Sequence, residues 1–96
     1  MFFIVVLAKY TFDMLRSNQV VAYEGNDMGG KSKISLEGCK EFCDQQSGCQ
    51  SFAYCSGSKS CWLKDRTLYG SEKTRTNSDC TTYFKSSGKI WLKVSR

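Results

Sequence analysis

Six cysteines between positions 39 and 80 are the residues of this chain whose types and spacing could do chemistry. Cysteine thiols serve as nucleophiles, metal ligands or disulfide partners. The chain has no histidine and no C-x-x-C pair, which argues against a zinc site and against a cysteine or serine nucleophile activated by a base. In a chain of 96 residues, six cysteines are typical of a disulfide framework formed in an oxidising compartment, so we expect an extracellular or secreted protein.

The acidic residues offer no alternative catalytic site. The nine aspartates and glutamates are scattered along the chain without an obvious pair that could act as general acid and base. We therefore predict no catalytic residues, no metal and no cofactor, and a function in binding instead of catalysis.

A short helix must position the first two cysteines. Cys39 and Cys43 lie four residues apart, which places them on one face of a helix. Ser35 is a favourable N-cap, Glu37 complements the positive end of the helix dipole, and Gly48 supplies the stop. The predicted apolar stripe consists of Leu36, Cys39, Phe42 and Cys43.

The other cysteines lie in segments with strand or turn character. We predict strands over 49–54, 61–64 and 80–85, and a hairpin turn over 56–60. Residues 25–30 (GNDMGG) are predicted to form a turn or loop because of their glycines and Asx side chains. The polar residues 65–77 are predicted to form a long loop that is mobile or faces a ligand.

The two ends of the chain are both apolar. The start, MFFIVVLA, is compatible with the apolar region of a signal peptide, with Val20-Val21-Ala22 as a small-residue cleavage site, or with a β-strand. The apolar run is too short to span a bilayer. The end, GKIWLKVSR, alternates like a strand and could be an edge strand or dock on a neighbour, so homo-oligomerisation through the ends is possible in principle.

Basic residues are concentrated in the second half of the chain. Residues 1–56 carry five basic and six acidic side chains, for −1, whereas residues 57–96 carry nine basic and three acidic, for +6. This half could present a basic surface to an acidic partner, a glycan or a membrane, or its lysines could simply keep the domain soluble. Nucleic acid is not an expected partner of a disulfide-rich extracellular chain.

The cysteines and the aromatic residues between them resemble the PAN/apple domain family. The resemblance is carried by Cys39 and Cys43 on one helix, the strand Cys49-Gln50-Ser51-Phe52-Ala53-Tyr54, the strand Cys61-Trp62-Leu63, and the closing Tyr83-Phe84-Lys85. It implies an α+β fold in which a single helix packs on a curved antiparallel sheet of about five strands. We divide the chain into an apolar segment (1–11), a PAN/apple-like domain (12–86) and a C-terminal strand or docking tail (87–96).

The resemblance also implies disulfide partners that spacing alone leaves open among 15 pairings. It implies that Cys39 bridges Cys61 and that Cys43 bridges Cys49, and we predict that Cys55 pairs with Cys80. Apple domains proper also join their termini by a disulfide, but this chain has no cysteine before position 39.

Three functions are compatible with the family: protein–protein adhesion or assembly, carbohydrate binding, and a structural role in an extracellular filament or matrix. Some PAN domains bind galactose-type sugars through a lysine, a tyrosine and an acid near the loop after the C-x-L strand. The residues of this chain in that neighbourhood are Lys64, Asp65, Tyr69, Asp79 and Tyr83. The alternative is that the charged pair is merely solvated and Tyr69 covers the core.

Overall fold

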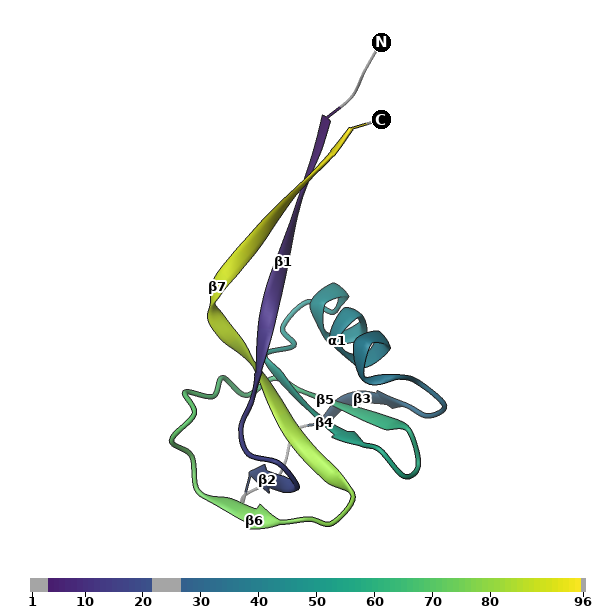
Figure 1. Cartoon of the computed structure of the whole chain (residues 1–96), viewed down its shortest axis with the longest axis vertical. Helices are drawn as coiled ribbons and strands as arrows, with labels where there is room; N and C mark the ends of the chain where they lie inside the picture. Colours follow the sequence, from purple (N-terminus) through teal and green to yellow (C-terminus); the bar gives the residue numbers. More distant parts are fainter. Residues whose placement is uncertain (1–3, 22–26, 96) are drawn as a thin grey trace.

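The computed structural model describes residues 4–21 and 27–95, and the side chains of residues 11–21 and 28–86. A helix, α1 (Leu36–Gln45), packs on a five-stranded sheet in the order β1-β7-β4-β5-β3, and β2 and β6 form a second, two-stranded sheet (Figure 1). All strand pairs are antiparallel. The strands are β1 (Ile4–Met14), β2 (Gln19–Val21), β3 (Asp27–Lys31), β4 (Ser51–Cys55), β5 (Ser60–Lys64), β6 (Thr74–Thr76) and β7 (Cys80–Ser95). The predicted α+β fold is confirmed.

The helix begins as its sequence predicts. Ser35 is the N-cap, and its hydroxyl accepts a hydrogen bond from the backbone N–H of Gly38 at 3.0 Å. Gln46 is the C-cap, and its N–H donates to the carbonyl of Cys43, so the last helical residue, Gln45, lies three residues before the predicted stop at Gly48. Gly48 instead has a φ of 87° in the turn that leads to Cys49, a conformation that favours glycine. The helix α1 has ten residues, and the described ranges contain no helix that is long and apolar enough to cross a membrane.

The main core lies between the helix and the sheet. Its buried members are Cys39, Cys43, Cys49, Phe52, Cys61 and Leu63. Phe52 is at its centre, with the ring of Phe12 edge-on at 5.3 Å and the ring of Tyr83 stacked at 5.2 Å. Because side chains alternate along a strand, the neighbours of these residues on β4 and β5, among them Ala53 and Trp62, lie on the opposite face of the sheet.

A second, smaller core forms on that opposite face. Leu15, Val21 and Leu68 are buried together, and Phe84 of β7 packs against them. Val20 and Val21, part of the considered cleavage site, are buried residues of β2, whereas Ala22 lies outside the described residues. The β2–β6 ribbon therefore covers part of the sheet face that the helix leaves open.

Two sequence predictions of loops are wrong in part. Residues 27–30 belong to β3 and not to a turn; Gly29 has a φ of 150° at a register shift, and Gly30 lies directly opposite Trp62. Residues 74–76 of the predicted long loop form β6 and pair with residues 19–21. Both strands depend on partners distant in the sequence, which local turn propensities do not reveal.

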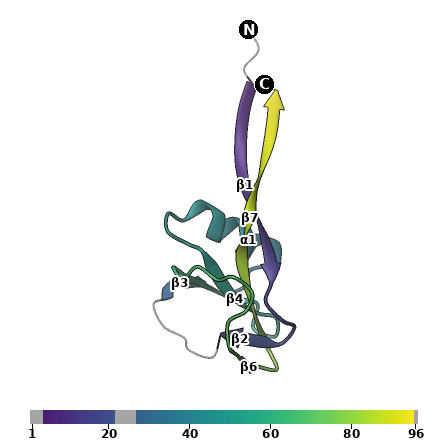
Figure 2. The same ribbon diagram turned by 90° about the vertical axis from the view of Figure 1, so that its left-hand side faces the viewer.

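The two ends of the chain pair with each other. Figures 1 and 2 show β1 and the C-terminal part of β7 extending together away from the rest of the molecule. The chain as a whole, with these ends included, measures 53 × 28 × 22 Å. Their register runs from Ile4↔Ser95 to Tyr10↔Lys89, then shifts before Phe12↔Lys85. The described parts of both terminal segments, residues 4–11 and 87–95, are thus strands in the structure. The division of the chain at residues 11/12 and 86/87 stays a prediction.

Candidate recognition surfaces

Three disulfides hold the described domain together. Cys39 bridges Cys61, Cys43 bridges Cys49, and Cys55 bridges Cys80, with Cα–Cα distances of 5.7, 5.3 and 4.0 Å. These are the same pairs that the sequence analysis expected. The first attaches the helix to β5, the second attaches it to the segment that leads into β4, and the third joins β4 to β7.

All six cysteine sulfurs are bonded in disulfides, so none is a free thiol that could bind a metal ion or act as a nucleophile. Cys55, Asp79 and Cys80 bring potential metal-ligand atoms within 4.8 Å of one another. However, both sulfurs are bonded to each other, and the Asp79 carboxylate accepts a 2.6 Å hydrogen bond from the N–H of Gly57. This cluster therefore caps the β4–β5 hairpin and does not form a metal site.

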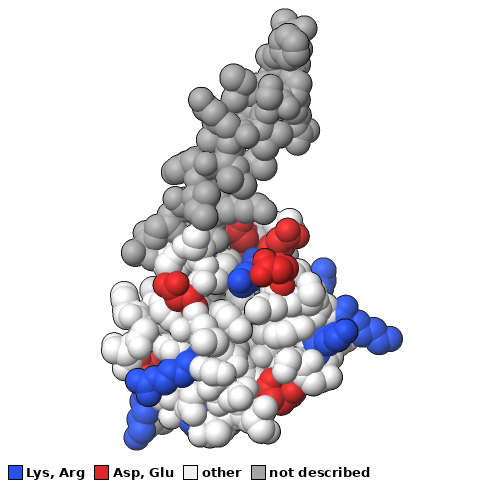
Figure 3. Space-filling view, viewed as in Figure 1, with Lys and Arg blue, Asp and Glu red and all other residues white. Residues whose placement is uncertain are grey.

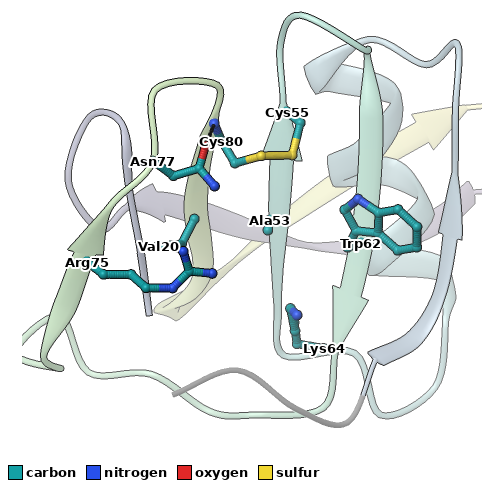
Figure 4. A pocket seen from close by; sticks show the side chains of 8 residues that line it. All are labelled: Val20, Ala53, Cys55, Trp62, Lys64, Arg75, Asn77 and Cys80. Atoms are coloured by element: carbon teal, nitrogen blue, oxygen red, sulfur yellow. Dashed lines mark hydrogen bonds between the residues drawn. A yellow bond between two sulfur atoms is a disulfide. The ribbon is translucent and has the colours of Figure 1, made fainter. Parts of the chain in front are cut away.

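A groove lies between β5 and β6 on the face of the sheet opposite the helix (Figure 4). It has a volume of about 230 Å³ and its floor includes Ala53 and the Cys55–Cys80 bridge. Trp62, with 45% of its surface exposed, and Lys64 project from β5, whereas Arg75 extends from β6 toward β4. The lining residues are Val20, Ala53, Cys55, Trp62, Lys64, Arg75, Asn77 and Cys80. We call this the Trp62 groove.

A second hollow lies beside the segment that follows β5. It has a volume of about 390 Å³ and is lined by Asp13, Gln50, Thr67, Leu68, Tyr69, Phe84, Lys85 and Ser86. Tyr69 is 82% exposed, whereas the neighbouring Leu68 is buried and anchors the segment. We call this the Tyr69 hollow.

A carboxylate organises the turn that carries Tyr69. Glu72 accepts hydrogen bonds from the backbone N–H groups of Tyr69, at 2.8 Å, and of Gly70, at 2.8 Å. Partial burial raises the pKa of Glu72, but these hydrogen bonds and the positive charge of Arg66 outweigh it, so the net pKa is lowered. The turn is therefore held in place by a charge that acid would remove.

A family model matches nearly half of the chain, residues 21–64. It is the model of the PAN domain. The PAN/apple resemblance of the cysteine pattern is thus confirmed. The match covers β3, α1, β4 and β5 with the Cys39–Cys61 and Cys43–Cys49 bridges. Comparison with curated proteins and with solved structures finds no match. As a class, PAN domains are modules that bind proteins or carbohydrates, and they are generally not catalysts.

The predicted ligand residues of this chain lie in different places. Lys64 lines the Trp62 groove and Tyr69 lines the Tyr69 hollow. Asp79 caps the hairpin through Gly57, and Tyr83 stacks on Phe52 at the edge of the core. Asp65 is exposed and lines neither depression. The structure does not bring these five side chains into one site, and their role in binding stays a prediction.

Sequence reasoning did not name Trp62, Arg75 or Asn77 as ligand residues, although Arg75 and Asn77 belong to the segment 65–77 that it expected to be mobile or to face a ligand. A signal existed for Trp62, since a residue between Cys61 and Leu63 on a strand must lie on the face opposite the core. Nothing in the sequence placed Arg75 beside Trp62, because Arg75 reaches the groove only through the pairing of β6 with β2.

Basic side chains do not form a single patch on the face seen in Figure 3. Lys and Arg gather at the lower left and at the right edge of that view, with acidic side chains between them. On this face, the described basic side chains therefore form separate groups.

Proposed function

We propose that this PAN domain is a non-catalytic extracellular recognition module that binds protein partners and assembles through the paired ends of its chain. Three disulfides and the PAN match both fit an extracellular protein. The observation that carries the proposal is the two-stranded ribbon of residues 4–10 and 89–95.

The register of the ribbon separates its residues into two different faces. Residues directly opposite each other in an antiparallel pair share a face, and neighbours along a strand alternate. One face therefore contains the positions of Val5, Leu7, Lys9, Ile90, Leu92 and Val94. The other contains the positions of Ile4, Val6, Ala8, Tyr10, Lys89, Trp91, Lys93 and Ser95. We call the first set, in which five of six positions are aliphatic, the aliphatic face.

The edges of the ribbon also favour association. β1 is the outer strand of the sheet, and β4 pairs with β7 only over residues 80–84, so no described strand continues the sheet on either side of the ribbon. An isolated two-stranded ribbon is marginally stable in water, and unpaired strand edges readily add another strand. A partner that covers the aliphatic face or extends an edge would stabilise the ribbon.

Substitutions at adjacent positions test the proposal. Leu7→Glu places a charge at the aliphatic face, whereas Ala8→Glu places the same charge at the other face. We expect multi-angle light scattering to give an assembly for the unaltered chain and for Ala8→Glu, and a monomer for Leu7→Glu. A monomeric unaltered chain, or equal masses for the two variants, would contradict assembly through this face.

The size of the assembly distinguishes a closed oligomer from a structural filament. A face that matches itself about a twofold axis closes into a dimer, whereas an edge that adds strands head to tail continues without closure. A mass of twice the chain supports the adhesion module. A mass that rises with concentration supports the filament or matrix subunit.

Carbohydrate binding is the second candidate, and the Tyr69 hollow favours it. An exposed tyrosine ring beside the polar side chains of Gln50, Asp13 and Lys85 offers an apolar surface for sugar C–H groups and partners for hydroxyls. A glycan array probed with the unaltered chain and with Tyr69→Ala tests this. Binding that survives Tyr69→Ala excludes the hollow as the site.

A further inference from the structure

We propose that the Trp62 groove binds an acidic saccharide: the indole stacks on a sugar ring while Lys64 and Arg75 pair with its carboxylate or sulfate group. This site is separate from the ribbon and from the Tyr69 hollow, and it contains only one of the five ligand residues expected from the sequence.

The indole is held in place by its neighbour on β3. Trp62 lies directly opposite Gly30, and a Cβ on Gly30 would come within 2.7 Å of the ring carbon Cε3. The ring therefore uses the space that the glycine leaves open, and 45% of its residue surface remains exposed. A rigid, exposed aromatic face is a suitable platform for the C–H side of a sugar ring.

The polar residues that line the groove favour a negatively charged ligand. Lys64 and Arg75 are cations, Asn77 has an amide, and none of the eight lining residues is acidic. A guanidinium pairs with a carboxylate or sulfate through two parallel hydrogen bonds, and such charge-assisted bonds are stronger than neutral ones. Lys64 and Arg75 each already interact within the chain, so the ligand would share or exchange these interactions. Charge complementarity thus favours an anion.

The size of the groove favours one ring of a longer chain. Its volume of about 230 Å³ is below the roughly 300–1,000 Å³ of pockets that enclose drug-sized ligands. A run of acidic side chains would pair with the cations but would place no apolar ring face against the exposed indole. A saccharide with a uronate or sulfate group satisfies both halves of the groove.

Titration with tetragalacturonate tests the inference directly. The chain has two tryptophans, so a Trp91→Phe background leaves Trp62 as the only indole reporter. We expect tetragalacturonate to change the Trp62 fluorescence, and its methyl ester, which keeps the sugar rings and removes the charge, to bind at least about tenfold more weakly. Equal binding of the ester would overturn the proposal, and tighter binding of hexaglutamate would assign the groove to acidic peptides instead.

Substitutions locate the site and separate it from general charge attraction. We expect Arg75→Ala and Lys64→Ala each to weaken binding about tenfold, and Lys73→Ala, an exposed cation outside the groove, to leave it within about twofold. Equal losses for Lys73→Ala and Arg75→Ala would overturn the proposal.

Further variants distinguish loss of the groove from misfolding of the chain and from failure of the proposed assembly through the ribbon. By nuclear magnetic resonance, which does not need the indole reporter, Trp62→Phe should retain most of the affinity that Trp62→Ala loses. Leu7→Glu, whether or not it changes the mass of the assembly, should bind tetragalacturonate normally. Loss of binding in Leu7→Glu would contradict a site in the groove of each chain.

Discussion

Gly30 of β3 and Trp62 of β5 form a cross-strand pair in which the absent Cβ of the glycine makes room for the indole. The pair explains why a segment rich in glycine, which the sequence presents as a turn, is a strand in the structure. It also sets the position of the largest side chain in the Trp62 groove.

The first prediction concerns this pair. Gly30→Ala forces the indole to move by some tenths of an ångström or more, and we expect a loss of about 1–2 kcal/mol in the free energy of unfolding. Urea unfolding measures the loss, and the emission of Trp62 in the Trp91→Phe background reports the movement. Ser32→Ala, at an exposed position nearby, should change stability by less than about 0.5 kcal/mol. Unchanged emission and stability in Gly30→Ala would contradict the close contact.

The second prediction separates two disulfides of similar span. Cys39–Cys61 and Cys55–Cys80 close loops of 22 and 25 residues, so their removal costs a nearly equal chain-entropy term of about 3–4 kcal/mol. Of these two bridges, only Cys39–Cys61 has both of its cysteines in the main core. We expect Cys39→Ala/Cys61→Ala to lose at least about 1 kcal/mol more than Cys55→Ala/Cys80→Ala, because it also leaves a buried cavity. Equal urea midpoints would show that the core bridge acts through the unfolded chain alone.

The third prediction concerns the start of the helix. Ser35→Ala removes the acceptor for the Gly38 N–H, and we expect it to cost about 1 kcal/mol. Ser35→Asp should restore most of the stability because its carboxylate accepts the same hydrogen bond and lies at the positive end of the helix dipole. Thermal unfolding followed by circular dichroism compares the three chains. Equal stability of the alanine and aspartate variants would contradict a capping role.

The fourth prediction is a pH dependence of the Tyr69 turn. The pKa of Glu72 is lowered from 4.5 in the folded chain, so the stability that its charge contributes is complete above about pH 4.5 and is lost as the pH falls through the lower folded value. We expect the amide signals of Tyr69 and Gly70 to shift and their hydrogen exchange to accelerate in that acidic range. In Glu72→Gln, exchange should be fast at neutral pH and the acidic transition should be absent. A transition that persists in this variant would assign it to another group.

The helix and the hairpin could be predicted because their signals are local. The Ser35 cap and the four-residue spacing of Cys39 and Cys43 act within one or two turns of helix. The alternation around Phe52 and Cys61 sets the buried face of β4 and β5. The third bridge was expected because Cys55 and Cys80 were the two cysteines left after the resemblance had paired the other four. In the structure they lie at opposed positions of β4 and β7.

The candidate site was less predictable than the fold that carries it. Lys64 and Tyr69 were expected together, but they line two different depressions because Leu68 turns the intervening chain into the second core. Arg75 and Asn77 enter the groove with β6, whose only strand partner among the described residues is β2.

By itself, the sequence indicated a disulfide framework and the arrangement of helix and hairpin, because these follow from residue type and from spacings of a few residues. The partners of the cysteines were implied by the resemblance to the PAN/apple family, since spacing alone leaves them open. The tertiary structure decided the pairing of β2 with β6, the conversion of a glycine-rich segment into β3, and the register that joins both ends in one ribbon. Each of these depends on contacts between residues tens of positions apart, whose free energy exists only once the core has brought the segments together.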